Sequence, residues 1–485
     1  MQYYDDYRRY IDEMITVPVV KASGRGTLSF TPYISNQCSA ACRFCSEKLY
    51  NGGIAGAALT LCPDYRERLT DVLLSQRARP IFLSISGMEP TESIGQLALV
   101  SEAVQKAESL GCRFSERVMY SNLSGFAKDF ERLTDLVRTL QLTRIECSRH
   151  HFREETNQEI VRFKPGEPIR RNSELTRIVR ELLPIVPVTM VCVMQKNGIA
   201  SPEDVRAYLE FARETGVQRV VFRGLSIFSG TADGTAVSSY IHENRVEALD
   251  MIRALSADAF HLKSVTQGYY YYSFCYEYRD MQVLFEMSDY DQMHREHHST
   301  QQHKLIFYPN GELYKDWNRD PQGKVACPDP KERLASLAEV ARELTADGSC
   351  AVIGSFGAWL TVPQVLDHVP HDLDLFLRND PDAIRRAVRL LQDRGFSVFS
   401  WQDRIHEDVS MELLRGRYYI RGIRDALTVD LTYEIRSIGY DAMVPHCIRV
   451  NGIGTYTPQG LMKLLEVCER DDLRERLGRM RDALL

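Results

Sequence analysis

Short apolar segments alternate with longer amphipathic ones six times between residues 26 and 224, and this alternation constrains the fold more than any other feature. Each apolar segment is short, rich in β-branched residues and apolar enough to be buried on both faces. The expected strands are 26–35, 80–86, 114–122, 143–148, 186–194 and 217–225. Several of the segments between them begin at Ser, Thr, Asp or Pro and end at Gly, as helices do. The sequence therefore predicts an α/β fold of parallel βα units, either a doubly wound sheet or a partial or complete barrel.

A different pattern follows in residues 268–316. Residues 268–287 predict an antiparallel hairpin with a turn near Arg279, and Asn310-Gly311 between two apolar runs predicts a second hairpin. The Pro/Gly-rich segment 321–330 is a plausible domain boundary. We expect an N-terminal extension (1–25), a barrel with the hairpin segment (26–330), a connecting helix (331–345) and a smaller α/β domain (346–485).

Length and charge exclude some classes of partner. A chain of 485 residues is too long for one ordinary core. Its formal net charge of −6 supplies no broad basic surface, which argues against nucleic acid as the main partner. No stretch approaches the run of about 18 apolar residues that a membrane helix needs, and the first residues lack the apolar core of a signal peptide. We expect a cytoplasmic protein that acts on a small molecule and has no membrane partner.

Three cysteines, Cys38, Cys42 and Cys45, lie within eight residues, directly after the first predicted strand. Thiolates bind soft metals and iron–sulfur clusters, and active sites of parallel α/β folds lie at this edge of the strands. Three thiolates on a four-iron cluster leave one iron open to a small molecule. The alternative is a zinc site completed by His150 or His151, but zinc sites usually combine two C-x2-C pairs, and the sequence has no second pair.

The C-x3-C-x2-C spacing, with Phe44 before the last cysteine, resembles the radical S-adenosylmethionine (radical SAM) superfamily over residues 26–230. The resemblance implies a partial (β/α)6 TIM-like barrel in which Cys38, Cys42 and Cys45 hold a [4Fe–4S] cluster and SAM chelates the open iron. One electron, from a donor such as flavodoxin or ferredoxin, would cleave SAM to a 5′-deoxyadenosyl radical that takes hydrogen from the substrate. Phe44 would lie near the SAM adenine.

The same resemblance assigns SAM contacts to the ends of later strands. Residues 84–92 look like the Gly-Gly-Glu-Pro segment of the family, so Gly87 and Glu89 would meet the SAM amino group, and a carboxylate suits that ammonium. The match is imperfect because Met88 follows the glycine. The other candidate SAM ligands are Ser148, Asn197 and Arg223.

Several neighbouring residues keep alternatives open. Arg149 is a further candidate beside Ser148, whereas a salt bridge to an acidic residue is an equal alternative for Arg223. His150 and His151 either contact the substrate or cap a polar loop. An auxiliary cluster would have to use the distant single cysteines Cys275 and Cys327.

A second constellation lies near the C-terminus. Gly354-Ser355 follows an apolar strand and begins a helix, whose N-terminus can hold a phosphate. Asp372 and Asp374, one residue apart on a strand, point to the same face, and Asp430 lies on another apolar strand. Three converging carboxylates would hold Mg²⁺, although a solvated strand edge can carry the same pattern.

This second pattern resembles the nucleotidyltransferase fold. The resemblance implies that Asp372 and Asp374 bind metal, that Asp430 helps to deprotonate the acceptor hydroxyl, and that the Gly-Ser turn binds a nucleoside triphosphate with Mg²⁺. The closing segment 457–477 looks like the terminal helices of small antibiotic-modifying and toxin-associated members, with Lys463 facing inward.

These patterns predict a two-module enzyme of specialised metabolism. The barrel would act on a nucleotide, sugar or amino acid, and the second module would transfer a nucleotidyl group or bind a nucleotide. Two other classes stay open: an RNA-modifying radical SAM enzyme whose C-terminal domain only binds nucleic acid, and a non-catalytic iron–sulfur or zinc scaffold.

Overall fold

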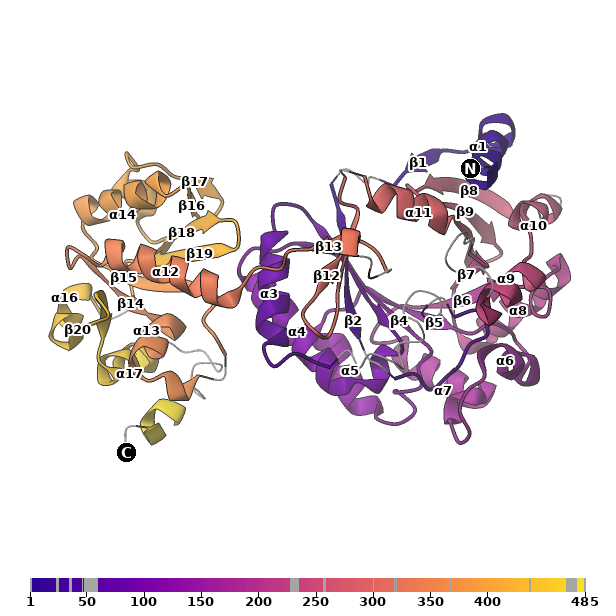
Figure 1. The fold of residues 1–485 in the computed structure, drawn as a ribbon, viewed down its shortest axis with the longest axis horizontal. Helices are drawn as coiled ribbons and strands as arrows, with labels where there is room; N and C mark the ends of the chain where they lie inside the picture. The colour runs from indigo at the N-terminus through magenta and orange to yellow at the C-terminus, as the bar shows by residue number, and fades with distance from the viewer. Residues whose placement is uncertain are drawn as a thin grey trace. The chain divides into compact units, whose positions relative to one another are not determined.

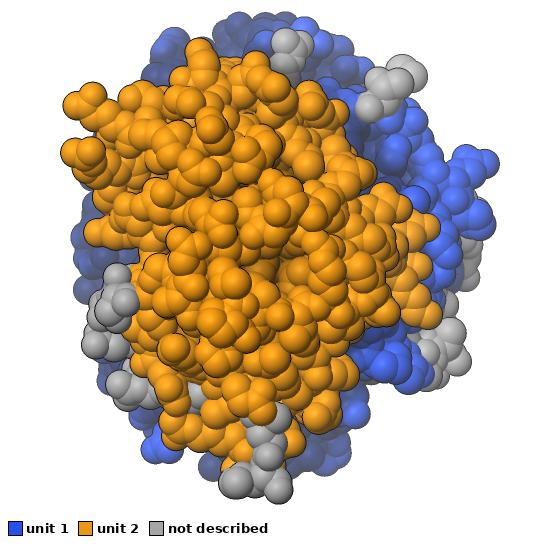
Figure 2. Space-filling model, turned by 90° about the vertical axis from the view of Figure 1, so that its left-hand side faces the viewer, with its two compact units in different colours: residues 1–69, 77–327 blue, residues 70–76, 328–485 orange. Residues whose placement is uncertain are grey.

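The computed structural model describes residues 2–22, 26–34, 37–45, 47, 60–226, 235–255, 259–299, 301–317, 319, 321–366, 368–435, 438–467 and 478–483. The chain divides into two compact units (Figure 2). Residues 1–69 and 77–327 form the first, here called the barrel unit, and residues 70–76 and 328–485 form the C-terminal unit. The division between 327 and 328 falls inside the Pro/Gly-rich segment 321–330.

The barrel unit is built on a 13-stranded sheet of order β1-β8-β9-β10-β7-β6-β5-β4-β3-β2-β11-β12-β13 (Figure 1). The run from β10 through β7 and β2 to β11 is parallel throughout. All six predicted strands form, and their ends lie within two residues of the expected ranges. They are β2 (Leu28–Ile34), β3 (Ile81–Gly87), β4 (Phe114–Ser121), β5 (Arg144–Ser148), β6 (Val188–Met194) and β7 (Arg219–Gly224).

Helices follow most of these strands. The five predicted ones are α3 (Tyr65–Ser75), α4 (Ile94–Ser109), α5 (Phe130–Thr139), α7 (Asn172–Leu182) and α8 (Pro202–Thr215). Helix α8 shows how the sequence specifies them: Ser201 and Asp204 form a capping box, Pro202 opens the first turn, and Gly216 ends the helix. The short α6 (Glu154–Val161), α9 (Ala236–Asn244), α10 (Ala248–Leu255) and α11 (Tyr290–His297) were not predicted.

Both predicted hairpins are present and extend the sheet at its two sides. Strands β9 (Tyr271–Tyr278) and β10 (Met281–Ser288) pair antiparallel around Arg279, and β10 continues the parallel run beside β7. On the other side β11 (Lys304–Phe307) pairs with β2 and turns into β12 (Leu313–Tyr314), which pairs with β13 (Lys324–Val325). The N-terminal extension forms α1 (Gln2–Met14) and β1 (Val19–Lys21), which pairs with β8 (His261–Gln267).

The two faces of the parallel sheet have different partners. Phe222 of β7 packs against Tyr208 of the covering helix α8, with ring centroids 5.4 Å apart. The alternate residues point to the opposite, inner face. There Val191, Val221 and Leu284 from β6, β7 and β10 form a small apolar cluster of their own. Side chains two positions further along these strands therefore face the inside of the barrel near the carboxyl ends.

The C-terminal unit contains a mixed eight-stranded sheet of order β17-β16-β18-β19-β15-β14-β21-β20. Its helix α12 (Pro330–Leu344), expected as a connecting helix, buries Leu337, Val340 and Ala341 in the core of this unit. The strands are β14 (Cys350–Ile353), β15 (Leu373–Leu377), β16 (Ser397–Ser400), β17 (Asp403–Arg404), β18 (Tyr419–Arg424), β19 (Leu427–Thr432), β20 (Cys447–Val450) and β21 (Ile453–Tyr456). The other helices are α13 (Gly354–Thr361), α14 (Pro381–Asp393), α15 (Met411–Leu414), α16 (Tyr440–Met443) and α17 (Pro458–Val467).

The architecture confirms the predicted fold class, an α/β partial barrel followed by a smaller α/β unit. Among the described residues, no helix is both long enough and apolar enough to cross a lipid bilayer.

Candidate active sites

The three clustered cysteines lie on a loop at the carboxyl end of β2, and this loop is bonded to the end of α6. The amide of Ala41 donates to the Val161 and Arg162 carbonyls, and the amide of Arg43 donates to Ile160, all at 3.1 Å. Cys38, Cys42 and Cys45 are each half-buried, so their sulfurs are both held and accessible. The loop therefore presents three thiols at the edge where α/β folds place their active sites.

The three sulfurs could serve a single zinc ion or an iron–sulfur cluster. A single zinc ion, with Zn–S bonds of about 2.3 Å, draws its thiolates to within about 4 Å of one another. Across the described ranges, only three aspartates bring metal-ligating atoms within 4.8 Å of one another. Cys38, Cys42 and Cys45 do not form a group this close in the described structure, and the choice of a cluster rests on their C-x3-C-x2-C spacing in the sequence.

Two N–H groups already point at the Cys38 sulfur. The Ala40 amide lies 3.4 Å from Sγ and the Asn122 Nδ2 atom lies 3.9 Å from it. Burial, followed by the charge of Glu89, raises the pKa of the Cys38 thiol to about 12. The thiol is thus protonated in the metal-free chain, and the two donors suit the thiolate that a bound cluster would require. Asn122 directly follows β4, and that position was its only signal in the sequence.

Gly87 lets the ends of β2 and β3 approach each other beneath the cysteine loop. Its φ is +142°, and a Cβ atom there would lie 2.2 Å from the Ile34 carbonyl oxygen. The next two amides continue the contact, since Met88 donates to the Ile34 carbonyl and Glu89 to the Gln37 carbonyl, both at 3.2 Å. The segment predicted to meet SAM is therefore joined to the cysteine loop through its backbone.

The Glu89 carboxylate is fixed in a buried position at the same edge. Its Oε1 atom accepts from the Thr91 amide and hydroxyl and from the Ser121 hydroxyl, and Oε2 accepts from the Asn122 amide at 2.8 Å. Burial raises the pKa of Glu89, and the four donors act in the opposite direction. Because Oε2 carries one protein donor, it has room for a second, so the predicted contact with an ammonium is geometrically possible.

Phe44 extends from the cysteine loop to the ends of the neighbouring strands. Its ring meets the His150 ring edge-on, with centroids 4.9 Å apart. It also belongs to an apolar cluster at the ends of β6 and β7 with Leu225, Ile241, Val193, Val237 and Tyr290. An aromatic ring in this position is suited to line an adenine pocket, which was its predicted role.

The three residues that follow β5 are buried and have structural roles. His150 accepts from the Val193 amide at 3.0 Å, and burial lowers its pKa to about 3, so this imidazole is neutral. His151 accepts from the Arg153 amide at 2.9 Å. Both histidines therefore cap backbone groups, the second of the two predicted roles. Arg149 is fully buried and bonded to the Ile169 and Arg170 carbonyls, which gives it a structural role.

Two further predicted SAM ligands lie near the carboxyl ends of their strands. Ser148 is the half-buried last residue of β5. Asn197 exchanges hydrogen bonds with the Tyr240 hydroxyl at 2.9 and 3.1 Å, so its side chain holds α9 to the end of β6. Contact of either residue with SAM stays a prediction.

Arg223 faces the inside of the barrel in a double ion pair. Its Nη2 donates to Glu146 of β5 and its Nε to Glu286 of β10, each at 2.8 Å. The guanidinium also lies 5.7 Å from the Tyr120 ring centroid. The salt-bridge alternative is therefore present, and these three charged residues form a layer above the apolar cluster of Val191.

Replacing Arg223 with methionine should destabilise the barrel, because Glu286 loses its ion pair and Glu146 keeps only the one with Arg144. We expect a loss of about 2 kcal/mol in the free energy of unfolding, measured by urea denaturation at neutral pH. Arg206→Met is the control: Arg206 pairs with Glu203 at the surface, so we expect a loss of about 0.5 kcal/mol or less.

The two cysteines considered for an auxiliary cluster have separate surroundings. Cys275 accepts from the Gln282 amide at 3.4 Å on β9. Cys327 donates to the Gly311 carbonyl at 3.3 Å and lines a pocket of about 640 Å³ together with Cys62. Within the part of the chain that the structure describes, neither belongs to a group of three close metal-ligating atoms.

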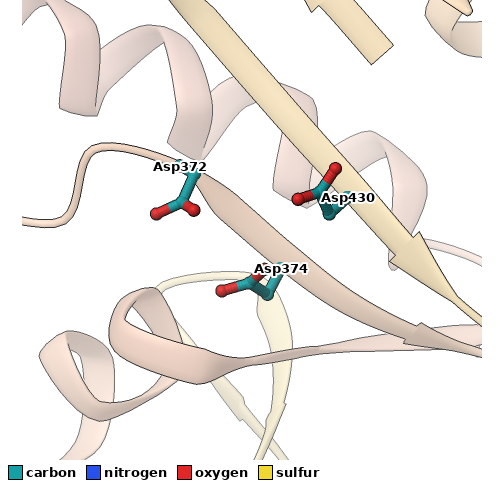
Figure 3. Close-up of side chains that lie close together, drawn as sticks. All are labelled: Asp372, Asp374 and Asp430. Atoms are coloured by element: carbon teal, nitrogen blue, oxygen red, sulfur yellow. The ribbon is translucent and has the colours of Figure 1, made fainter. Parts of the chain in front are cut away.

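The C-terminal unit brings its three predicted aspartates together (Figure 3). Asp374 of β15 is the register partner of Asp430 on the parallel neighbour β19, and Asp372 lies just before β15. Each offers a carboxylate oxygen within 4.8 Å of the others. Asp372 and Asp430 are buried and Asp374 is half-buried, an arrangement that a divalent cation would stabilise.

The Gly-Ser turn begins a helix beside this group, as predicted. Helix α13 starts at Gly354, whose φ is +64°, and a Cβ atom there would lie 2.2 Å from Oδ2 of Asp374. Ser355 is buried in the first turn. The helix N-terminus and the Asp374 carboxylate are therefore in contact through a position that only glycine fits.

Asp430 is held by a neighbour that the sequence did not indicate. Arg421, its cross-strand partner on β18, donates from Nε to Oδ1 at 2.8 Å and from Nη2 to Oδ2 at 2.7 Å. The bond to Asp430 raises the pKa of Arg421. Both oxygens of Asp430 therefore accept from the Arg421 guanidinium, and each keeps a lone pair for a further partner.

One prediction for the C-terminal unit is wrong. Lys463 was expected to face inward, but it is exposed on α17, whereas Leu461 and Leu464 provide the buried face. Leu461 and Leu464 are three residues apart and share the buried face of the helix, whereas Lys463 lies on the exposed side. Residues 468–477 of the predicted closing segment lie outside the described residues.

No protein-family model and no curated protein matches the chain. Among solved structures it is similar to anSMEcpe with bound AdoMet, at 14% identity over 40% of this chain and 50% of that one, with a TM-score of 0.34. It is also similar to SuiB of Streptococcus suis, at 13% identity over 54% of this chain and 54% of that one, with a TM-score of 0.31. HemN of Escherichia coli, a coproporphyrinogen III oxidase described as a radical SAM enzyme, matches at 11% identity over 71% of this chain and 87% of that one, with a TM-score of 0.34. The chain matches about half the length of the first two. TM-scores this low assign no activity, so the function is inferred from this chain's own residues.

Proposed function

We propose that the barrel unit is a radical SAM enzyme acting on a small-molecule substrate. The observation that supports this most is the anchored loop of three half-buried thiols at the carboxyl edge of a parallel barrel. Such a loop suits a [4Fe–4S] cluster with one iron left for SAM. The bound cluster would supply the electron that cleaves SAM to a 5′-deoxyadenosyl radical.

The chain's own residues would hold and shield this chemistry. Cys38, Cys42 and Cys45 would ligate the cluster, with N–H groups of Ala40 and Asn122 directed at Cys38. Glu89, fixed by its buried hydrogen bonds, would receive the SAM ammonium. Phe44 and its apolar neighbours would cover the adenine and exclude water. Flavodoxin or ferredoxin would supply the electron.

The test is anaerobic reconstitution with iron and sulfide, followed by addition of SAM and a one-electron reductant. We expect 5′-deoxyadenosine to form, and we expect the electron paramagnetic resonance signal of the reduced cluster to change when SAM is added. A zinc or iron–sulfur scaffold would release no 5′-deoxyadenosine and would show a signal that ignores SAM. Either result would reject the proposed enzyme.

We propose a second activity for the C-terminal unit, nucleotidyl transfer to the substrate or product of the barrel. Asp372 and Asp374 would hold Mg²⁺ and the triphosphate of a nucleotide, with the helix that starts at Gly354 beside them. Asp430, which Arg421 holds in place, would take the proton of the acceptor hydroxyl. The alternative for this unit is that it binds a nucleotide without transferring it.

Replacing Asp372 or Asp374 with asparagine should abolish transfer, because each change removes a negative charge that would hold the metal. We expect incorporation of labelled nucleotide, measured with Mg²⁺, to fall by about 100-fold or more. Asp382→Asn is the control, because this exposed aspartate lies on α14, away from the three carboxylates. Equal incorporation by all three proteins would discard catalysis at this site.

A further inference from the structure

Lys304 stands on the inner wall of the barrel, on the strand that closes one side of it. Residues 304, 306 and 308 share one face, and Tyr308 stacks on Tyr33 of β2 with ring centroids 5.0 Å apart. The Tyr33 hydroxyl in turn donates to Glu47, just beyond the cysteine loop, at 2.9 Å. The other face of β11 is the outer one, since Phe307 packs against Tyr65 of α3. Lys304 therefore faces the interior below the cysteine loop.

The Lys304 ammonium has unused hydrogen-bond donors. Its Nζ atom lies 4.1 Å from the centroid of the Trp317 ring, a cation–π contact. Over the described ranges, Nζ makes neither a hydrogen bond nor a salt bridge. Burial lowers the pKa of Lys304 to about 8, although the charges of Asp316 and Glu47 oppose this. Partial burial of a charged ammonium that has no hydrogen-bond acceptor raises the free energy of the folded protein.

The two nearest carboxylates are occupied by other donors. Asp316 accepts from the Trp317 amide at 2.6 Å through Oδ1, and through Oδ2 it pairs with His294 at 2.9 Å and lies 3.4 Å from His297. Glu47 accepts from Tyr33 through Oε2. The negative charges of Asp316 and Glu47 repel anions from the rest of this region. An anionic ligand is therefore attracted only where it can contact the Lys304 ammonium directly.

The opposite wall carries the layer of Glu146, Arg223 and Glu286. The Arg223 donors Nε and Nη2 are taken by the two glutamates, which together outnumber its charge. Burial raises the pKa of Tyr290, and the charges of both Arg223 and Asp316 act on this phenol. Arg223 and Asp316 are thus both close enough to act on Tyr290, and Lys304 is a cation of this region without an ion-pair partner among the described residues.

We propose that Lys304 binds an anionic group of the substrate, a carboxylate or a phosphate, inside the barrel. An anion at Nζ would accept the unused N–H bonds, and the Trp317 ring would hold the ammonium in place. The inference rests on the proposed function, since it deepens the choice among nucleotide, sugar and amino acid: it favours a nucleotide, a sugar phosphate or an amino acid over an uncharged sugar.

The position of Trp317 allows binding to be measured directly. The chain has three tryptophans, Trp317, Trp359 and Trp401. The other two belong to the C-terminal unit, so Trp359→Phe with Trp401→Phe leaves a single reporter next to Lys304. The reconstituted full-length protein carrying these two changes is titrated with inorganic phosphate and separately with succinate, each against chloride at matched ionic strength.

We expect a saturable change in Trp317 fluorescence with at least one of the two anions. Lys304→Met should weaken it by about tenfold or more and Lys304→Arg by about threefold or less, because arginine keeps the charge. A response to phosphate alone identifies a phosphate site, and a response to succinate alone a carboxylate site. Lys324→Met, at an exposed lysine paired with Glu312, should leave the response unchanged.

Three outcomes would overturn the inference. They are no saturable response to either anion, an equal response in Lys304→Met, and a loss of SAM binding in Lys304→Met, which would assign the lysine to the cofactor. Thermal unfolding of each variant shows whether the fold is kept, and the arginine variant keeps the test valid if the methionine variant unfolds. Formation of 5′-deoxyadenosine is measured in the same preparations, so failure of the radical SAM activity is seen separately from failure of anion binding.

Discussion

Replacing Cys42 with alanine should abolish both the iron–sulfur chromophore and 5′-deoxyadenosine formation. Cys42 lies in the middle of the anchored loop, and a four-iron cluster that loses one of three protein ligands has two irons without a thiolate. We expect the rate of SAM cleavage to fall by about 1000-fold or more, because the reducing electron reaches SAM through the cluster. The iron content per chain, the visible absorbance and the product yield would be measured together under anaerobic conditions.

Cys447→Ser is the matched control for this experiment. Cys447 is an exposed cysteine on β20 in the C-terminal unit. The Cys447→Ser protein should retain the full iron content and the full rate of SAM cleavage. A Cys42→Ala protein that keeps wild-type iron and product would show that the loop does not ligate the cluster, and the proposed function would then fail with it.

The strands and the position of the cysteine loop could be predicted because both are local properties of the chain. Each barrel strand is a short β-branched run, and the carboxyl end of the first run is where Cys38 must lie. The same reasoning placed Asp374 and Asp430 on strands, although it could not show that β15 and β19 are neighbours. Pairing between distant strands is not encoded in any local pattern.

Side-chain roles were predictable only where the backbone restricts them. Gly87 and Gly354 each stand at a turn that follows a strand, and both proved necessary for a close approach. Polar residues such as His150 and Arg149 gave no such signal, because their partners are backbone groups brought in by other elements. The contact of Asn122 with Cys38 could not be predicted for the same reason, because it spans 84 residues of sequence.

Charged residues were the hardest to assign. Arg223, Lys304 and Arg421 all lie on strands, and no local sequence pattern distinguishes the partners of one from those of another. In the structure Arg223 has two carboxylate partners, Arg421 holds one in a bidentate bridge, and Lys304 faces a tryptophan ring. The partner of each cationic side chain depends on the register of strands that are far apart in the chain. A function for Lys304 could therefore be inferred only from the structure.

Replacing Gly87 with alanine should strongly disrupt the mouth of the barrel. The added Cβ would lie 2.2 Å from the Ile34 oxygen and 2.7 Å from the Ile34 nitrogen, and these are backbone atoms that cannot rotate away. Alanine is also strained at a φ of +142°. Since the strand ends must separate, we expect a loss of about 4 kcal/mol in the free energy of unfolding.

The same movement should reach the cysteines. Met88 and Glu89 donate to Ile34 and Gln37, so separating β3 from β2 also displaces the loop that begins at Gln37. We expect a Gly87→Ala protein to bind less than half the normal iron even at temperatures where it stays folded. Gly95→Ala is the control, because no atom lies within 4 Å of the added Cβ on α4. Its stability and iron content should match or exceed those of the unmodified protein, since alanine favours a helix. Normal iron binding in the Gly87 variant would mean that the cysteine loop is positioned without the contact to β3, leaving α6 as its main anchor.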